Sequence, residues 1–520
     1  KIRLMYIFGV VGLLVLLIAC ANYMNLATAR SIERAKEVGI RKVVGSHRRQ
    51  LIQQFLTEAI LLSLVAFAIS ISLVELILPG FNQLVDKSLG VDYINNPTLM
   101  IWFLGVTLFT GFVSGIYPAF VLSSFKPTLV LKGKFSRSRQ GKRLRQGLVV
   151  FQFCASAMIM IATWVLYRQM YYIETKDLGF DTEQIFALKF MDEQDQQKSV
   201  LLKQQLLQNP HIASITGTYY GFGIGHTWTD VQLKAKKNIL VEDLPADKSL
   251  VSTLGLKVIQ GQNFDPANLS SNPNDVIVNE SLVKASGWTN PIGKKIGCNI
   301  ENGKPTQYLT IQGVVEDFHG ATLHQKITPV IIRLLNKNRT QAANQLLIRL
   351  RPHHHSETLG FIKRVWEEAG MKYPFEGTFL GQRFAKAYDI ERKRGQLFLV
   401  FSLIAVFTAC LGLWGMASFI INQRSKEMGI RKVLGASISQ ILILLSSGFV
   451  RLVLVSCVIA FPMAYYFMQQ WLQNFAYRTD LHWSMFVFTA LAIFLLALFT
   501  VSIQALRTAR VNPVKVLKDE

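Results

Sequence analysis

Seven long apolar runs alternate with polar stretches along the chain. They cover residues 4–26, 55–78, 99–122, 148–167, 397–421, 441–468 and 485–506. An α-helix rises about 1.5 Å per residue, so roughly 20 apolar residues cross the ~30 Å hydrocarbon layer of a bilayer. We therefore predict seven membrane-spanning helices, because the core helices of a water-soluble protein are rarely so long and so numerous.

A charged decapeptide occurs twice, each time between two apolar runs. Residues 36–45 read KEVGIRKVVG and residues 426–435, which lie 390 positions later, read KEMGIRKVLG; eight of the ten positions are identical. Such a repeat indicates a tandem duplication, and it places two basic turns on the same side of the membrane. We therefore look for function in whatever contacts these two turns.

Basic residues gather on one side of the predicted membrane. Eight Lys or Arg and no acidic residue lie between positions 126 and 145, and further basic residues cluster at 30–49, 424–432 and 507–518. If every run crosses, these stretches share a side, which the positive-inside rule assigns to the cytoplasm. The opposite side then receives residues 79–97, 471–483 and the long polar segment 169–395.

The polar segment 169–395 predicts an α/β domain. Strand-like runs at 185–190, 275–278, 309–315 and 346–350 alternate with helical stretches at 195–208 and 356–369, and Gly, Pro and Asn separate them. A last helix over 385–395 is expected to continue into the span that begins at Leu397. A continuous helix would couple movement of the domain to the membrane.

The predicted fold is an α-helical membrane protein with tandem helical repeats and one α/β extracytoplasmic domain. Its parts are three membrane helices with a charged turn at 30–50 (1–125), a basic cytoplasmic linker (126–146), one membrane helix (147–168), the outer domain (169–395) and three membrane helices with a charged turn at 422–437 (396–520). The second copy has a span and an outer domain that the first lacks. The repeat therefore predicts roughly 250 further residues in front of Lys1.

Composition agrees with a membrane protein that contacts lipid. Half of the residues are hydrophobic, the mean hydropathy is +0.29 and the net charge is +23. A chain so apolar is not typical of a soluble nucleic-acid-binding protein, and we expect no nucleic-acid partner. Cys298 alone among the cysteines lies outside the spans, so we expect no intrachain disulfide. We expect the three histidines at 353–355, and Asp317 with His319, to be structural, and we assign no metal site and no catalytic residue.

The charged turns carry a pattern that resembles a known family. Residues 33–45 follow E-R-x-K-E-x-G-I-R-K-V-x-G, and residues 423–435 follow it with Gln423 in place of the first Glu. This pattern is similar to the signature loop of FtsX/MacB-like ABC transporter permeases. The stretches 253–264, 276–296 and 311–332 resemble the periplasmic core domain of the same family, with Gln262 where the family usually has Arg.

The resemblance implies a double-length ABC transporter permease of a bacterial inner membrane. It implies that a separate ATPase dimer docks on the two turns, and that this chain is not an enzyme and holds no cofactor. ATP hydrolysis by the partner would move the periplasmic domain for efflux of a drug or peptide, or for lipoprotein extraction. A periplasmic adaptor and an outer-membrane channel are further partners in such systems.

A short helix in each turn is expected to present the docking residues to the ATPase. These residues are Glu37, Gly39, Arg41, Lys42, Gly45, Glu427, Gly429, Arg431, Lys432 and Gly435. Two other functions remain open. A non-transporting regulator of cell-envelope enzymes or a peptide sensor could use the same fold, and a membrane-anchored enzyme would need a convergent polar site within 169–395.

Two charged residues fall inside predicted spans. The repeat offset places Arg451 opposite Leu61, one helical turn from Glu58, so the two charges lie at a similar depth. An unpaired charge in a span costs about 2.5 to 3.5 kcal/mol, and an ion pair between Glu58 and Arg451 is one arrangement that would avoid this cost. Alternatively, each side chain extends to the membrane interface. Gly111 and Gly115 form a small-xxx-small pattern, which predicts a helix-packing face.

Overall fold

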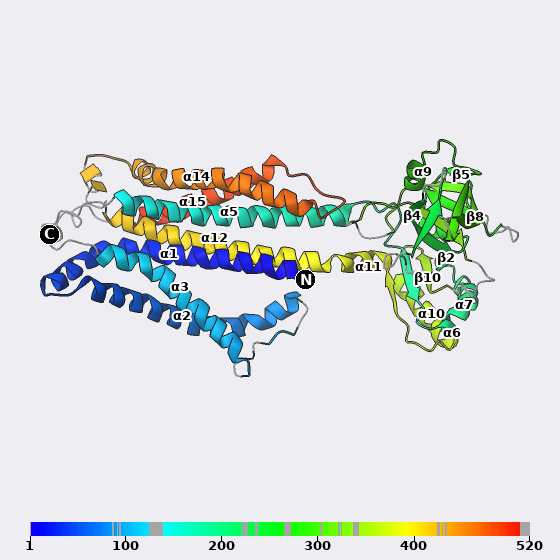
Figure 1. Ribbon diagram of the computed structural model, residues 1–520, viewed down its shortest axis with the longest axis horizontal. Helices are drawn as coiled ribbons and strands as arrows, with labels where there is room; N and C mark the ends of the chain where they lie inside the picture. The colour runs from blue at the N-terminus through cyan, green and yellow to red at the C-terminus, as the bar shows by residue number, and fades with distance from the viewer. Residues whose placement is uncertain are drawn as a thin grey trace. The chain divides into compact units, whose positions relative to one another are not determined.

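The computed structural model describes residues 2–85, 88–90, 92, 95–123, 139–219, 222, 227–233, 238–264, 272–301, 304–320, 323, 325–335, 343–423, 427–428, 430–431 and 434–509. The chain forms two compact units (Figure 1). The helical unit comprises Lys1–Arg168, Arg392–Trp471 and Asp480–Glu520, and the α/β unit comprises Gln169–Glu391 and Leu472–Thr479. The predicted outer domain thus gains a short segment from the connection between the last two membrane helices.

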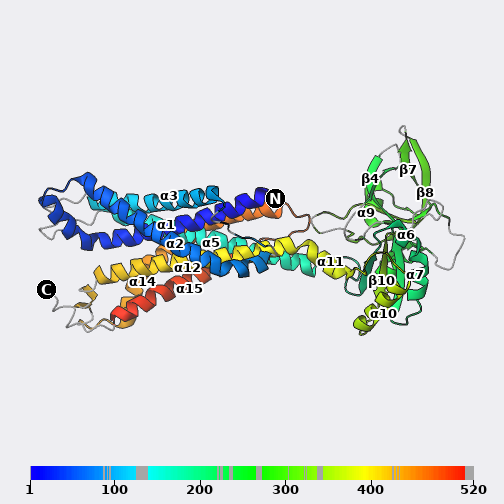
Figure 2. The same cartoon turned by 90° about the horizontal axis from the view of Figure 1, so that it is seen from below.

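Long apolar helices build the helical unit and run side by side (Figure 2). They are α1 (Ile2–Val43), α2 (Arg48–Val85), α3 (Pro97–Ser123), α5 (Arg139–Thr175), α12 (Asp389–Gln423), α14 (Ile438–Leu472) and α15 (Trp483–Ala509). Each contains a stretch that is long and apolar enough to cross a membrane, so the seven predicted apolar helices are confirmed. Because α5 begins at Arg139, part of the predicted linker 126–146 is helical; residues 124–138 lie outside the described part of the chain.

Three hydrophobic clusters hold the helical unit together. One joins α1, α2 and α3 through Val38, Phe55 and Ala119. A larger one joins α5, α12, α14 and α15. A third joins α1, α5 and α12, so it links the two copies of the duplication through their equivalent first helices. α1 and α12 therefore lie at the centre of the unit.

The glycine pattern on α3 is a packing face, as predicted. A Cβ atom at Gly111 would lie 2.5 Å from Ser63 Oγ, and one at Gly115 would lie 2.6 Å from Ala59 Cβ. Ser63 and Ala59 belong to α2, so these two glycines let α2 and α3 approach closely.

A polar contact joins the two copies where α1, α5 and α12 meet. Asn22 Nδ2 and Gln152 Nε2 donate to the carbonyl of Thr408, at 3.3 and 3.1 Å. A Cβ atom at Gly412 would lie 2.8 Å from Asn22 Oδ1 and 2.9 Å from Gln152 Nε2. Gly412 is the repeat counterpart of Asn22, so the duplication has diverged where the copies pack on each other. Sequence reasoning missed this contact.

Within its described residues, the α/β unit contains eleven strands and six short helices. The strands are β1 (Ile185–Lys189), β2 (Ile212–Thr218), β3 (Thr227–Gln232), β4 (Asn238–Ala246), β5 (Val258–Gly261), β6 (Asp275–Asn279), β7 (Lys295–Glu301), β8 (Lys304–Val315), β9 (Val330–Leu334), β10 (Gln345–Leu350) and β11 (Gly377–Phe379). The helices are α6 (Glu193–Gln197), α7 (Ser199–Leu206), α8 (Leu250–Leu254), α9 (Glu280–Ser286), α10 (His355–Glu368) and α11 (Leu380–Ala387).

Strand pairing divides this unit into two parts. β11, β1, β10 and β2 form an antiparallel sheet. β4, β3, β7, β8, β6 and β9 follow one another in a closed ring, because β9 pairs in parallel with β4. Strand pairing joins the two parts at one pair of residues, Thr218 on β2 and Ala246 on β4, and a hydrophobic cluster with residues from both parts lies between them. Separate hydrophobic clusters fill the ring and cover the sheet beneath α7 and α10.

The predicted elements of this unit are largely confirmed, with two corrections. The four expected strands are β1, β6, β8 and β10. The helix expected over 195–208 is two helices that meet at Lys198. The helix expected to enter the membrane from residue 385 is also interrupted: α11 ends at Ala387 and α12 starts at Asp389. Between them, the hydroxyl of Tyr388 accepts a hydrogen bond from Leu323 N, and this tertiary contact sets the break.

Candidate functional site: the two charged turns

The first charged turn is the end of α1 rather than a separate helix. α1 runs without interruption to Val43. The prediction of a separate short helix after the span is therefore wrong for this copy. Val38 and Gly39 are buried, and Val38 packs with Leu51 and Phe55 of α2 and Ala119 of α3. One side of the decapeptide is therefore fixed to the neighbouring helices.

The backbone of this turn forms a Schellman motif. Gly45 has φ +102°, Ser46 N donates to Arg41 O at 3.0 Å, and Gly45 N donates to Lys42 O at 3.2 Å. This pair of hydrogen bonds closes a helix through one left-handed residue, which is usually Gly because a side chain there is strained. The prediction that Gly45 ends the helix is confirmed.

The second turn repeats the same geometry. Gly435 has φ +92°, Ala436 N donates to Arg431 O at 2.9 Å, and Leu434 N donates to Ile430 O at 3.0 Å. The first turn has the corresponding two hydrogen bonds 390 positions earlier in the sequence. Gly435 thus ends the second turn as predicted, whereas Gly429 and Lys432 lie outside the described residues.

The helix that follows each turn is capped in the same way. His47 N donates to Gln50 Oε1 at 2.9 Å, and Ser437 N donates to Gln440 Oε1 at 3.1 Å. In the second copy Gln440 N also donates to Ser437 Oγ at 3.3 Å, which completes a capping box. Both turns therefore pass from one helix to the next through a short, hydrogen-bonded connection.

Each decapeptide contains an ion pair between two residues that lie one helical turn apart. Arg41 and Glu37 approach to 2.7 Å, and Arg431 and Glu427 to 2.9 Å. All four side chains are about half exposed, and exposed pairs contribute only about 0.2 to 1 kcal/mol. Their main effect is to hold a guanidinium and a carboxylate in a fixed arrangement at the surface, where a partner protein can bind both.

Exposed apolar side chains accompany these charges, and sequence reasoning missed them. Val44 is 82% exposed and its counterpart Leu434 is 79% exposed; Ile40 and Ile430 are about half exposed. Large apolar side chains beside charged ones at a turn are typical of a protein–protein contact surface. The sequence signal was present, because both decapeptides keep an apolar residue directly before the final glycine.

Lys42 is directed inward, unlike the half-exposed Glu37 and Arg41 of the same turn. Its ammonium donates to the carbonyl of Ser123, the last residue of α3, at 2.7 Å. Burial, and secondly the nearby charge of Arg48, lowers the pKa of Lys42. A cation at the C-terminal end of a helix is favourable, so Lys42 anchors the first turn to α3.

The proposed intramembrane pair of Glu58 and Arg451 does not form. The ion pairs of the described residues include none between them. Glu58 lies on α2, which packs on α3, whereas the exposed Arg451 of α14 lines a groove with Ser447 of α14 and Leu498 of α15. α2 and α14 lie on the outer sides of their copies, with α1 and α12 between them (Figure 1).

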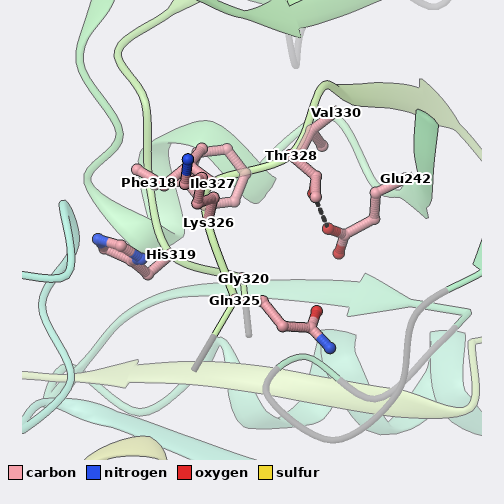
Figure 3. A pocket seen from close by; sticks show the side chains of 9 residues that line it. All are labelled: Glu242, Phe318, His319, Gly320, Gln325, Lys326, Ile327, Thr328 and Val330. Carbon is pink, nitrogen blue, oxygen red and sulfur yellow. Dashed lines mark hydrogen bonds between the residues drawn. The ribbon is translucent and has the colours of Figure 1, made fainter. Parts of the chain in front are cut away.

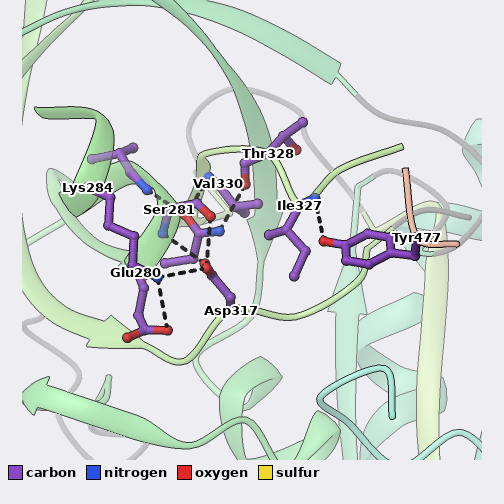
Figure 4. Close-up of polar contacts among 10 residues, drawn as sticks. Glu280, Ser281, Lys284, Asp317, Ile327, Thr328, Val330 and Tyr477 are labelled. Carbon is purple, nitrogen blue, oxygen red and sulfur yellow. Dashed lines mark hydrogen bonds and ion pairs between the residues drawn. The ribbon is translucent and has the colours of Figure 1, made fainter. Parts of the chain in front are cut away.

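A second polar region lies in the α/β unit around Tyr477, which follows α14 (Figure 4). Ile327 N donates to the Tyr477 hydroxyl at 3.3 Å, and Gln169 Nε2 donates to its carbonyl at 2.9 Å. Gln169 Oε1 accepts from Thr479 N at 2.8 Å. Lys176 Nζ lies 4.7 Å from the centre of the tyrosine ring. These contacts fix the segment Leu472–Thr479 within the α/β unit.

His319 packs edge-on against Tyr477, with the ring centres 4.8 Å apart. It lines a small pocket (Figure 3) with Glu242, Phe318, Gly320, Gln325, Lys326, Ile327, Thr328 and Val330. The pocket's cavity volume is about 10 Å³, enough for one water at most. Burial, followed by the charge of Lys176, lowers the pKa of His319 to about 4. His319 is therefore neutral and packed rather than a poised catalytic base.

Asp317 serves a neighbouring structural role. Its two carboxylate oxygens accept hydrogen bonds from Ser281 N and Ser281 Oγ, both at 2.8 Å, and Lys284 Nζ lies 3.5 Å away. The Asn279 side chain accepts from Leu282 N and Val330 N. Figure 4 shows these contacts converging at the start of α9. Among the described residues no nucleophile is oriented by His319.

Comparison with known proteins agrees with the repeated turns. The profile of the FtsX-like permease C-terminal domain matches residues 9–127 and 399–513, and each match contains one turn. The two membrane halves belong to the FtsX-like permease family. The chain is thus a multi-pass membrane protein with two FtsX-like permease halves and one α/β domain, as the sequence predicted.

Relatives of these halves include macrolide export ATP-binding/permease proteins called MacB. Identity is 32% over 117 residues with the protein of Bdellovibrio bacteriovorus, covering 22% of this chain and 17% of that protein. It is 31% over 122 residues with that of Syntrophobacter fumaroxidans (24% and 16%) and 29% over 127 residues with that of Escherichia coli (23% and 19%). The matched part spans less than a fifth of each relative.

Solved structures similar to this chain are extracytoplasmic domains of transporters. The periplasmic region of MacB from Actinobacillus actinomycetemcomitans aligns over 41% of this chain and 97% of that one, with 14% identity and a TM-score of 0.30. The extracellular domain of the ABC-type transporter YknZ from Gram-positive bacteria aligns over 37% and 99%, with 12% identity and a TM-score of 0.28.

Proposed function

We propose that this FtsX-like permease is the membrane subunit of an ABC transporter, and that each charged turn docks one subunit of an ATPase dimer. One observation carries the proposal: the same closed turn is built twice, with an exposed Glu–Arg pair and an exposed apolar residue before its glycine. A duplicated site fits a partner with two equivalent subunits.

The turns are suited to transmit force as well as to bind. In the first copy, Val38 packs against α2 and α3, and Lys42 binds the end of α3. A push on the turn therefore acts on three helices together. α12 is one unbroken helix from Asp389, which belongs to the α/β unit, to Gln423, which precedes the second decapeptide. ATP-driven movement at the turns would thereby move the α/β unit, the mechanism called mechanotransmission.

The location and cargo follow from the same proposal. The basic turns would face the cytoplasm of a bacterial inner membrane, and the α/β unit would lie in the periplasm. Relatives named as macrolide exporters combine ATP binding and permease in one protein; here we assign ATP hydrolysis to a separate subunit. The cargo would be a drug, a peptide or a lipoprotein, with a periplasmic adaptor and an outer-membrane channel as candidate partners.

Co-purification with the ATPase tests the docking sites. The chain is purified from its own host in detergent, and the bound ABC ATPase is quantified. Glu37→Ala with Arg41→Ala should weaken binding about tenfold or more, since truncating an arginine at the centre of an interface can cost about 2 kcal/mol and 1.4 kcal/mol is tenfold. Adding Glu427→Ala and Arg431→Ala should remove the remaining ATPase.

A matched control uses an exposed pair with the same spacing elsewhere. Lys363 and Glu367 on α10 form such a pair at 3.9 Å, so Lys363→Ala with Glu367→Ala should leave ATPase binding at the wild-type level. Stoichiometric ATPase on the quadruple variant would disprove docking at the turns, as would an equal loss in the α10 control.

A further inference from the structure

Three side chains from two distant parts of the α/β unit meet at its surface. They are His211, His354 and Glu357, and one possible ligand atom from each lies within 4.8 Å of the others. The rings of His211 and His354 stack with centres 4.3 Å apart. His354 Nδ1 lies 3.5 Å from Glu357 Oε2. Two imidazoles and a carboxylate are therefore concentrated at one point.

The backbone holds the two histidines in place independently of this contact. His211 N donates to Asn209 Oδ1 at 2.9 Å, and its carbonyl accepts from Arg351 N at 2.8 Å. The carbonyl of His354 accepts from Thr358 Oγ1 at 2.7 Å and from Thr358 N at 3.0 Å. The start of β2 and the start of α10 thus present their histidines to each other from fixed positions.

An unfavourable backbone conformation produces this arrangement. His353 has φ +77°, and it is the one non-glycine residue with positive φ in the described part of the chain. A bulky residue there is strained, and such strain often accompanies a functional site. It turns the chain between β10 and α10 so that His354 faces His211, while His355 packs near Phe379.

We propose that His211, His354 and Glu357 bind a divalent transition-metal ion, with Zn²⁺ the best match. Imidazole nitrogens and a carboxylate are ligands that Zn²⁺ accepts in tetrahedral sites, at about 2.0 to 2.2 Å, whereas Mg²⁺ and Ca²⁺ prefer oxygen ligands alone. The ligand atoms must approach further, which the exposed side chains of His354 and Glu357 can do by small rotations. A water molecule would complete the tetrahedron.

The ion would tie the start of β2 to the start of α10. These two elements pack on the same hydrophobic cluster, and the metal would join them at its rim. The sequence predicted no metal site here, because of the three adjacent histidines only His354 faces the cluster. His211 lies far away along the chain. Glu357, three residues after His354, gains significance as a ligand only when His211 is brought beside them.

Calorimetric titration with ZnCl₂ tests the site in the full-length chain. The protein is purified in detergent with an affinity tag that lacks histidine, and bound metal is first removed with a chelator. Wild type should bind one Zn²⁺ per chain. His211→Ala, His354→Ala and Glu357→Gln should each weaken binding about tenfold or more. His482→Ala, at an exposed histidine outside the cluster, is the matched control and should bind like wild type.

Thermal unfolding provides a second measurement that does not depend on heats of binding. Zn²⁺ should raise the melting temperature of wild type and of His482→Ala, because a ligand that binds only the folded state stabilises it. At the same Zn²⁺ concentration the shift should be clearly smaller in Glu357→Gln, because weaker binding stabilises the folded state less, and its exposed side chain is not needed for folding. Absence of stoichiometric binding by wild type, or equal binding by all variants, would overturn the proposal.

Discussion

His319 illustrates how one residue's environment sets its behaviour. It is buried against Tyr477, and burial, followed by the charge of Lys176, lowers its pKa to about 4. A free histidine has a pKa near 6.5, so between these two values the unfolded chain binds a proton that the folded chain does not. Stability therefore falls as pH decreases through this window, by roughly 3 kcal/mol at most.

Replacing His319 should remove that part of the pH dependence. The melting temperature of wild type should decrease more between about pH 7 and pH 5 than that of His319→Gln, because glutamine does not titrate. Tryptophan fluorescence of the full chain in detergent reports the transition, and His482→Gln should behave like wild type. Equal pH dependence in wild type and His319→Gln would show that the imidazole is not held neutral.

Residues were predictable from the sequence only where their role is local. Gly45 and Gly435 were expected to end helices, and each adopts the positive φ that a Schellman turn requires. The partner of His319 could not be predicted, because Tyr477 lies more than a hundred residues away along the chain. For the same reason Lys42 was expected to face a partner, although its position relative to Ser123 depends on how α3 packs.

At the scale of elements, hydrophobic length and small-residue spacing carried most of the information. The seven spans and the packing face at Gly111 and Gly115 are patterns within one segment, so they could be identified in advance. The break at Tyr388 between α11 and α12, and the distance between Glu58 and Arg451, depend on how segments assemble. Neither hydrophobic periodicity nor the repeat offset shows how separate segments pack on one another.

The contact of α12 with α1 and α5 predicts a large effect from a small substitution. Gly412→Ala places a methyl group less than 3 Å from Asn22 Oδ1 and Gln152 Nε2, and overpacking of this kind costs about 1 to 3 kcal/mol. The variant should melt several degrees below wild type in detergent. Gly448→Ala on α14 is the matched control, because no atom lies within 4 Å of its Cβ position.

The control should be neutral or slightly stabilising, since alanine favours a helix more than glycine does. If Gly412→Ala melts like Gly448→Ala, the two copies are not packed closely at this point. In that event the polar contact of Asn22 and Gln152 with Thr408 would not be the link between the halves.

At the scale of the whole molecule, the duplication explains the division of tasks. Two equivalent sets of helices carry equivalent turns, and a single α/β unit receives α5, α12 and the segment Leu472–Thr479. The repeated turns could be found from the sequence, because the decapeptides are nearly identical. The exposed apolar residues of the turns could not be identified from the sequence, because Val38 and Val44 are both apolar. The structure shows that Val38 is buried and Val44 is exposed.

Site-specific photocrosslinking in native membranes tests the central claim most directly. A photoreactive amino acid replaces Val44 in one variant and Leu434 in another, the most exposed apolar residues of the two turns. A third variant carries it at Tyr308, an exposed position of the α/β unit. We predict that both turn positions crosslink to an ABC ATPase and that Tyr308 does not. Failure of both turns to capture the ATPase, or its capture from Tyr308, would contradict the account.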